Sequence, residues 1–370
     1  MRAFFKVERN AALLVLAAGI LGLIAANTPA ASIASSIADL QFGFLGLDFD
    51  IRQLVSEFLM TGFFMLIGLE LKRELHSGVF RDRRALALPA ASALLGAVVP
   101  AVVFFVLVGT NQDASGGWPI PMATDVTFAL AIFTVFAKSM PESARTFLLS
   151  FAVIDDLIAI AVIAIFLGNG FNFAYLVATI FTIWVFAYVS RLRGPLALIA
   201  SVLVAIAAWS FTERAGISAV VVGVALGLVT SPSRVEAIEK RLHPWVSLAV
   251  LPVFAFFATG VSLAGGLAVT SAMTVAILLR PLGKIVGING GAIVVRTLMK
   301  NSGFDDLRPA QIARISTLGG IGFTVALLIS NQIFGAGSVL ANQAIVATLA
   351  AMVISMILGA IALASGKSAK

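Results

Sequence analysis

Residues 118–128 read W-P-I-P-M-A-T-D-V-T-F, and residues 317–324 read T-L-G-G-I-G-F-T. Each stretch interrupts a long apolar segment with residues that a helix disfavours, because Pro removes a backbone donor and Gly weakens the helix. Unwound backbone at membrane depth persists only where it is buried in protein or faces water. The two stretches therefore predict two discontinuous membrane helices.

The composition points to a protein that is embedded in a membrane. Of the 370 residues, 60% are hydrophobic and 12% are charged, whereas a soluble domain carries about 25% charged residues. The absence of cysteine excludes disulfides, thiolate metal sites and a cysteine nucleophile. Two histidines, His76 and His243, are too few for a His-rich metal site. No nucleic-acid partner is expected, because a bias of basic residues toward the cytoplasm explains the net charge of +7 better.

Apolar segments divide the chain into about twelve membrane spans, since a crossing helix needs about 20 apolar residues. The first has a basic flank, but its apolar run is longer than that of a signal peptide, so we expect a retained helix. The sequence thus predicts an all-α polytopic membrane protein with spans at 11–32, 54–75, 85–108, 119–137, 146–167, 173–190, 195–211, 216–230, 245–266, 270–295, 311–334 and 341–364.

The basic residues predict the orientation of these spans. With the N-terminus inside, 21 of the 25 Lys and Arg residues fall on the inner side, and two, Arg52 and Arg214, fall on the outer side. The remaining two, Arg280 and Lys284, lie within the tenth span. Such a bias is typical of cytoplasmic segments and predicts that both termini are cytoplasmic.

The broken spans occupy matching places in two triplets of opposite topology, 85–167 and 270–364. This arrangement is typical of inverted-repeat secondary transporters. We therefore expect a single transporter domain, 1–370, in which the two triplets form the core and residues 11–75 and 173–266 form a panel of interface helices.

Residues 41–51, QFGFLGLDFDI, alternate apolar and polar positions around Leu45–Gly46, which predicts a small β-hairpin on the outer face. Two interpretations stay open: a loop lying on the membrane surface, or a strand edge that contacts a second copy of the chain.

Two adjacent acids, Asp155 and Asp156, lie near the middle of the fifth span. A charge at that depth costs about 3 kcal/mol or more, so intramembrane acids are usually functional. Oxygen ligands suit small hard cations, and two close, buried carboxylates should gain affinity for protons. A site that holds either a proton or a cation, when exposed to each side in turn, exchanges the two. The alternative is a structural ion pair with Arg280 or Lys284.

Arg280 and Lys284 are four residues apart in the tenth span and therefore share a helix face. One or both could pair with Asp155 or Asp156, although Lys284 could instead extend to the inner membrane surface. The broken helices also leave dipole ends at the bilayer midplane. Asp125 could offset the positive ends of these helix dipoles, and a cation of the tenth span could offset their negative ends.

Four titratable residues lie at the predicted cytoplasmic edge: Glu70, Glu74, Glu239 and His243. They are either solvated helix ends or a cluster that responds to pH near neutrality.

The ordered set of motifs resembles the NhaA family of bacterial sodium/proton antiporters nearly from end to end. The motifs are G-L-E-L-K-R-E-L, P-M-A-T-D-V-T-F-A-L, I-D-D-L, L-H-P-W, L-P-V-F-A-F, R-P-L-G and G-G-I-G-F-T. The resemblance implies twelve helices in a bacterial inner membrane, with the discontinuous fourth and eleventh helices crossed. It also implies a homodimer joined through the hairpin 41–51, and exchange of Na⁺ or Li⁺ for H⁺, typically two protons per cation.

By this resemblance Asp155 and Asp156 form the cation and proton site, with Asp156 as the principal ligand, and Thr124 and Asp125 lie at the helix break. Glu70, Glu74, Glu239 and His243 match positions linked to pH response. The chain departs from the family pattern at Arg280, where a lysine is usual, and at Ser218, where some members have histidine. Because arginine does not readily release a proton, either the stoichiometry changes or Lys284 takes over that role.

Other functions fit the sequence less well. An intramembrane aspartyl protease should show Tyr-Asp and Gly-x-Gly-Asp, which are absent, and a membrane metalloprotease needs histidine ligands. We therefore expect a transporter rather than an enzyme, with no cofactor. The main alternative is a proton-coupled metabolite carrier of the inverted-repeat type; a channel is disfavoured because paired broken repeats suit alternating access.

Overall fold

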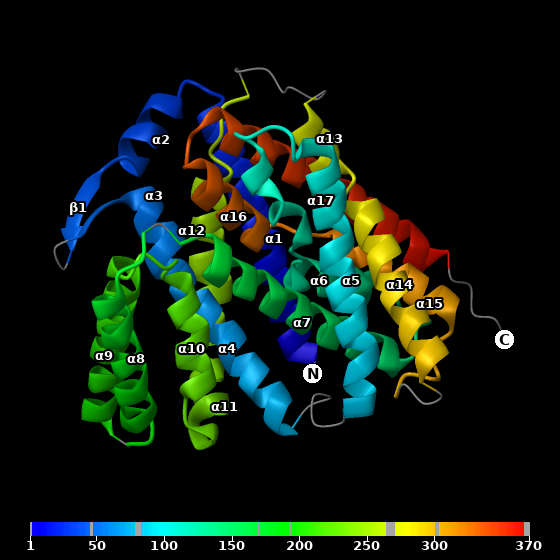
Figure 1. Cartoon of the computed structure of the whole chain (residues 1–370), viewed down its shortest axis with the longest axis horizontal. Helices are drawn as coiled ribbons and strands as arrows, with labels where there is room; N and C mark the ends of the chain where they lie inside the picture. The colour runs from blue at the N-terminus through cyan, green and yellow to red at the C-terminus, as the bar shows by residue number, and fades with distance from the viewer. Residues whose placement is uncertain are drawn as a thin grey trace. The chain divides into compact units, whose positions relative to one another are not determined.

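The computed structural model describes residues 2–44, 47–77, 83–168, 170–192, 194–263, 271–299 and 303–365, with backbone alone for 2–9, 44, 47, 77 and 83. The chain forms two units (Figure 1). Unit 1 comprises Met1–Ala12, Val79–Ala159 and Val261–Lys370, and unit 2 comprises Leu13–Gly78 and Ile160–Gly260.

All regular secondary structure in the described part of unit 1 is helical. It holds the start of α1 (Arg2–Ala26), then α5 (Arg83–Val108), the 3₁₀ turns η3 (Ser115–Gly117) and η4 (Ile120–Met122), α6 (Val126–Phe136), most of α7 (Glu142–Phe166), α13 (Ala272–Leu278), α14 (Arg280–Leu298), α15 (Pro309–Ser316), η6 (Thr317–Gly320), α16 (Thr324–Phe334) and α17 (Val339–Ala364).

Helices α5 and α14 lie side by side in unit 1 (Figure 1) because glycines allow a close backbone approach. A Cβ atom on Gly287 would lie 2.2 Å from the carbonyl oxygen of Leu95, and one on Gly291 would lie 2.3 Å from that of Ala91. Small residues four apart are the usual means by which membrane helices approach closely. The packing of α14 against α5 holds Arg280 and Lys284, both residues of α14, in unit 1.

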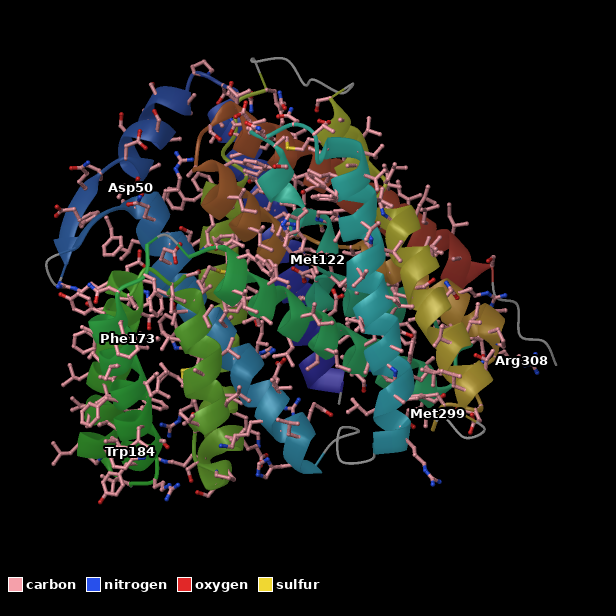
Figure 2. All side chains as sticks on the ribbon, viewed as in Figure 1. Asp50, Met122, Phe173, Trp184, Met299 and Arg308 are labelled. Atoms are coloured by element: carbon pink, nitrogen blue, oxygen red, sulfur yellow. The ribbon has the colours of Figure 1, made fainter. Side chains whose placement is uncertain are left out.

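Unit 2 contains most of α1, α2 (Ala31–Ala38), the strands β1 (Gln41–Phe44) and β2 (Leu47–Asp50), the continuous helix α3–η1–α4 (Ile51–Gln53, Leu54–Leu59, Met60–Ser77), the end of α7, α8 (Phe173–Val189), α9 (Pro195–Arg214), α10 (Val220–Val229) and the continuous helix α11–η5–α12 (Pro232–Trp245, Val246–Val250, Leu251–Ala258). The segments η1 and η5 are π-helical. Gly68, Gly223 and Gly227 bring α4 and α10 together, and α8 lies along α9 with its labelled residues Phe173 and Trp184 exposed (Figure 2).

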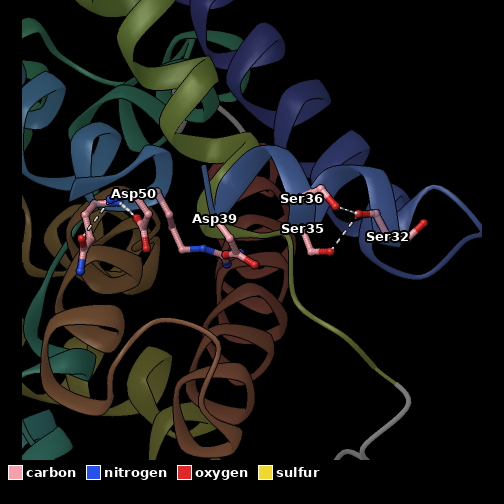
Figure 3. Close-up of polar contacts among 7 residues, drawn as sticks. Ser32, Ser35, Ser36, Asp39 and Asp50 are labelled. Atoms are coloured by element: carbon pink, nitrogen blue, oxygen red, sulfur yellow. Dashed lines mark hydrogen bonds and ion pairs between the residues drawn. The ribbon is translucent and has the colours of Figure 1, made fainter. Parts of the chain in front are cut away.

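The predicted hairpin is confirmed as a two-stranded antiparallel sheet in which Gln41 pairs with Asp50 and Phe44 with Leu47. Its predicted turn, Leu45–Gly46, lies outside the described residues. Figure 3 shows the polar contacts around it: Asp50 caps α3 through the backbone N–H of Gln53, and Arg52 lies 3.9 Å from Asp39. Phe49 is buried against Trp209, with ring centroids 5.3 Å apart, so the hairpin is anchored to the core of unit 2.

Several helix limits differ from the predicted spans, and prolines account for most of the differences. The first helix ends at Ala26, before Pro29, and the chain turns by 111° into α2. The ninth begins at Pro232 rather than at 245, because proline is favoured at a helix start. The tenth bends by 48° between α13 and α14, where Pro281 cannot donate the backbone hydrogen bond of a regular helix.

Seven helices among the described residues are long and apolar enough to cross a membrane, or ten if each of three bent pairs is one span. The helices α8 and α10 are apolar but shorter. Each of the twelve predicted ranges overlaps one of these segments. The number of crossings, their crossed arrangement and the inverted symmetry stay predictions.

Candidate functional site

Both predicted helix breaks are present in unit 1, and they are bonded to each other. Residues 123–125 and 321–323 are non-helical. The backbone N–H of Asp125 donates to the carbonyl oxygen of Ile321 at 2.6 Å, and the Thr124 hydroxyl donates to that of Gly319 at 2.7 Å. A Cβ on Gly322 would lie 2.4 Å from the Ala123 carbonyl oxygen, so only glycine fits there. Met122, which directly precedes the first break, is buried (Figure 2).

The carboxylate of Asp125 joins the N-terminal ends of two helices. Its Oδ1 accepts hydrogen bonds from the backbone N–H groups of Thr127 and Phe128, at the start of α6. Its Oδ2 accepts from the hydroxyl of Thr324 at 2.8 Å and from the backbone N–H of the same residue, at the start of α16. A carboxylate at a helix N-terminus opposes the positive end of the helix dipole, and this one serves two such ends.

Asp155 forms a buried ion pair with Lys284. Lys284 Nζ lies 2.7 Å from Oδ1 and 2.8 Å from Oδ2, and both side chains are fully buried. The backbone N–H of Thr124 also interacts with this carboxylate, and the Thr124 hydroxyl, which donates to Gly319, lies close to it. The second acid, Asp156, is 6% exposed and lies within electrostatic range of Lys284. Unit 1 thus brings both acids, the first helix break and a lysine into one cluster.

Arg280 is fully buried and contacts the second break instead of an acid. Its Nη2 donates to the carbonyl oxygen of Gly322 at 3.1 Å and approaches that of Thr348 at 3.4 Å. Among the described residues, no carboxylate lies within ion-pair distance of this guanidinium. The carbonyl of Gly322 follows the C-terminal end of η6, where positive charge is favourable.

The four residues proposed for pH response belong to unit 2. Glu239 pairs with Arg73 of α4, and His243, one turn further along α11, lies within electrostatic range of both. Glu70 and Glu74 lie one turn apart on α4 and are half-buried. The six residues predicted for the transport site therefore belong to unit 1, and the four residues predicted for pH response belong to unit 2.

The site residues predicted from the sequence did not include three residues that take part in these contacts. Thr324 closes the second break onto Asp125, Thr348 faces Arg280, and Arg73 pairs with Glu239. The position of Thr324, directly after a glycine-rich break and facing a Thr-Asp break, was a usable signal. Thr348 gave none, because isolated threonines are common in membrane helices.

A family model described as Na⁺/H⁺ antiporter 1 matches residues 2–363, almost the whole described chain. The chain belongs to this family. Similar relatives include Na(+)/H(+) antiporter NhaA 1 of Saccharopolyspora erythraea, 36% identical over 97% of this chain and 90% of the relative. Na(+)/H(+) antiporter NhaA 2 of Clavibacter michiganensis is 38% identical over 90% of this chain and 84% of the relative. NhaA of Mycolicibacterium smegmatis is 36% identical over 97% of this chain and 86% of the relative. Membership confirms the resemblance drawn from the motifs.

Proposed function

We propose that this chain, a Na⁺/H⁺ exchanger by family, moves Na⁺ or Li⁺ out of the cytoplasm and H⁺ in by alternating access at Asp155 and Asp156. The observation that carries the proposal is the fully buried Asp155–Lys284 pair beside a second buried acid and two bonded helix breaks. Family membership favours this exchange over the alternative, a proton-coupled metabolite carrier.

Competition for one carboxylate provides the coupling. Lys284 occupies both oxygens of Asp155, so a sodium ion that binds them displaces the ammonium group. A buried ammonium without a partner is costly, and losing its proton relieves that cost. A sodium ion also competes with a proton for the carboxylate of Asp156. The cation and two protons therefore exclude each other.

Lys284 and Arg280 divide two tasks under this proposal. Lys284 carries a proton that can be released, whereas Arg280 stays charged and offsets the negative end of η6 near Gly322. The permanent charge of arginine at position 280 is then compatible with two protons per sodium ion, because the lysine one turn later supplies the second.

The cycle starts with deprotonated Asp156 open to the cytoplasm. Sodium binds Asp156 with help from Asp155 and Thr124, and Lys284 gives up its proton. The bonded breaks then rearrange, the site opens outward, and sodium leaves. One proton from outside binds Asp156 and another binds Lys284, the site turns inward again, and Asp156 releases its proton to the cytoplasm, which restores the starting state.

Further features of the proposal extend beyond the site. We expect the chain to act as a homodimer through the hairpin 41–51 in the lipid bilayer of a bacterial inner membrane, with cytoplasmic termini. Glu70, Glu74, Glu239 and His243 form the group that adjusts activity to pH, since Glu239 and His243 already share the neighbour Arg73.

Exchange in proteoliposomes tests the proposal. An imposed pH gradient should collapse on addition of Na⁺ or Li⁺ with the wild type, with K⁺ added as the comparison ion. Asp156→Asn should abolish the response while the protein remains folded. The matched control is Asp113→Asn, which changes an exposed acid of unit 1 and should leave exchange intact. Exchange by Asp156→Asn at the wild-type rate would refute the assignment.

A further inference from the structure

Two hydrogen-bond donors of Arg280 have no acceptor among the described residues. Only Nη2 is bonded, to Gly322 and Thr348, whereas Nε and Nη1 are buried without a partner. The side chain is 0% exposed. Buried polar groups in native proteins almost always have a partner, which is often ordered water.

Two buried hydroxyls lie on the helix that Arg280 contacts. Thr348 and Ser355 of α17 are both 0% exposed, and neither hydroxyl oxygen has a partner in the described part of the chain. Seven residues make almost two helical turns, so both side chains point to one face, about 10 Å apart along the axis. Ser355 adjoins the second break, since a Cβ on Gly320 would lie 2.4 Å from its Oγ.

The unpartnered atoms therefore follow one line along the second break, from the guanidinium past Thr348 to Ser355. Gly320 and Gly322 allow these side chains to approach the break, because a Cβ on Gly322 would lie 2.8 Å from Arg280 Nη1 and one on Gly320 would lie 2.4 Å from Ser355 Oγ. We propose that ordered water molecules occupy this line and solvate Arg280. Water suits the atoms because it accepts from Nε and Nη1 and both donates to and accepts from hydroxyls.

The charges of unit 1 favour water over a bound anion such as chloride. The buried charged residues in the described chain are three aspartates, Asp125, Asp155 and Asp156, and two cations, Arg280 and Lys284. An anion would add negative charge to a core where carboxylates already outnumber cations. Solvation by water also explains how Arg280 stays buried without drawing either acid of the Asp155–Asp156 pair to itself.

Met352 is a natural reporter for this line. It lies on α17 between Thr348 and Ser355, on the same face, and is 2% exposed. Helical side chains lean toward the N-terminus, so that of Met352 extends toward Thr348. Met273 of unit 1 and Met60 of unit 2 are equally buried, at 2% and 0%, and serve as internal controls.

Radiolytic hydroxyl labelling of the purified full-length protein tests the proposal, because radicals formed from internal water oxidise the side chains next to it. We expect Met352 to be oxidised several-fold faster than Met273 and Met60. The double substitution Thr348→Val and Ser355→Ala should lower that rate to the control level. Labelling of Met352 no faster than Met273 in the wild type would overturn the proposal, whether or not the variant folds.

A second arm separates water from an anion. The same labelling is carried out in chloride and in gluconate, together with thermal unfolding. Equal labelling and equal stability in both salts are expected for water. Stabilisation by chloride that disappears in Arg280→Lys, with slower Met352 labelling in chloride, would assign the site to an anion and overturn the water assignment.

Discussion

Lys284 Nζ lies 2.7 Å from one carboxylate oxygen of Asp155 and 2.8 Å from the other, and both side chains are shielded from solvent. Arg280, one turn earlier on α14, is equally buried but bonds to backbone carbonyls. The acid is therefore contacted by Lys284, whose charge can be lost by deprotonation, and not by Arg280, whose charge is permanent. This arrangement underlies the predictions that follow.

The ion pair should show strong coupling in a double-mutant cycle. Removing one member of a buried pair typically costs about 3–5 kcal/mol, because the other charge is left without a partner. Lys284→Met and Asp155→Asn should each destabilise the protein, and the double variant should cost clearly less than the sum. Unfolding in detergent measures these changes. Lys240→Met is the control, since its pair with Glu236 is exposed and should be worth nothing measurable. Strictly additive losses would mean that the two side chains do not interact.

Arg280 should tolerate lysine but not alanine. A lysine keeps the positive charge and can still donate to the carbonyls of Gly322 or Thr348, so Arg280→Lys should retain exchange. Arg280→Ala leaves those carbonyls without their donor and should be unstable or inactive. Sodium-driven proton movement and thermal unfolding check both variants. Ordinary stability and exchange in the alanine variant would refute the assigned role.

Because the two breaks lie so close together, Gly322→Ala should strongly reduce both stability and exchange. The added methyl group would lie 2.4 Å from the Ala123 carbonyl oxygen and 2.8 Å from Arg280 Nη1, and backbone cannot yield as a side chain can. Gly62→Ala is the matched control: apart from its chain neighbours and the backbone of its own helix, no described atom lies within 4 Å of the added methyl group, and alanine in a helix should add about 0.5–1 kcal/mol of stability. Thermal unfolding and exchange of the two variants provide the comparison, and equal behaviour would contradict the described geometry.

The hydroxyl of Thr324 should be needed to hold the breaks together. It donates to Asp125 Oδ2 at 2.8 Å in a buried setting, and hydrogen bonds to charged groups contribute about 1.5–3 kcal/mol. Thr324→Val should lose about that much stability and impair exchange, whereas Thr324→Ser keeps the hydroxyl and should keep function. Thr134→Val is the control, because Thr134 is an exposed residue of α6 whose hydroxyl, among the described residues, bonds only to Leu130 in the same helix. A valine variant as stable and active as the serine variant would count against this contact.

Much of the fold follows from local sequence signals. Apolar length located the helices, alternation located the hairpin, and the residues of the two breaks identified the non-helical segments at 123–125 and 321–323. The bend at Leu279 was missed, although Pro281 signals it, because a proline within a long apolar run does not reveal whether its helix bends or continues. The π-helical segments η1 and η5 have no comparable signal, since they depend on how neighbouring helices pack.

The sequence predicted which residues belong to the candidate site, but not which of them contact each other. Rarity of charge in the membrane singled out Asp155, Asp156, Arg280 and Lys284. Which cation meets which acid depends on the register of α14 against α7, and spacing along one helix does not contain that information. Contacts between distant segments, such as that of Arg280 with Thr348, could not be predicted for the same reason. The dimer, the membrane orientation and the pH response stay predictions.

The charge moved per sodium ion tests the central claim most directly, namely that Lys284 supplies the second proton. Reversal potentials in proteoliposomes with set Na⁺ and pH gradients give this ratio for the wild type, Arg280→Lys and Lys284→Arg. We predict two protons per sodium ion for the first two. Lys284→Arg should fall to one, because its guanidinium keeps its proton. An electroneutral wild type, or an unchanged ratio in Lys284→Arg, would contradict the account.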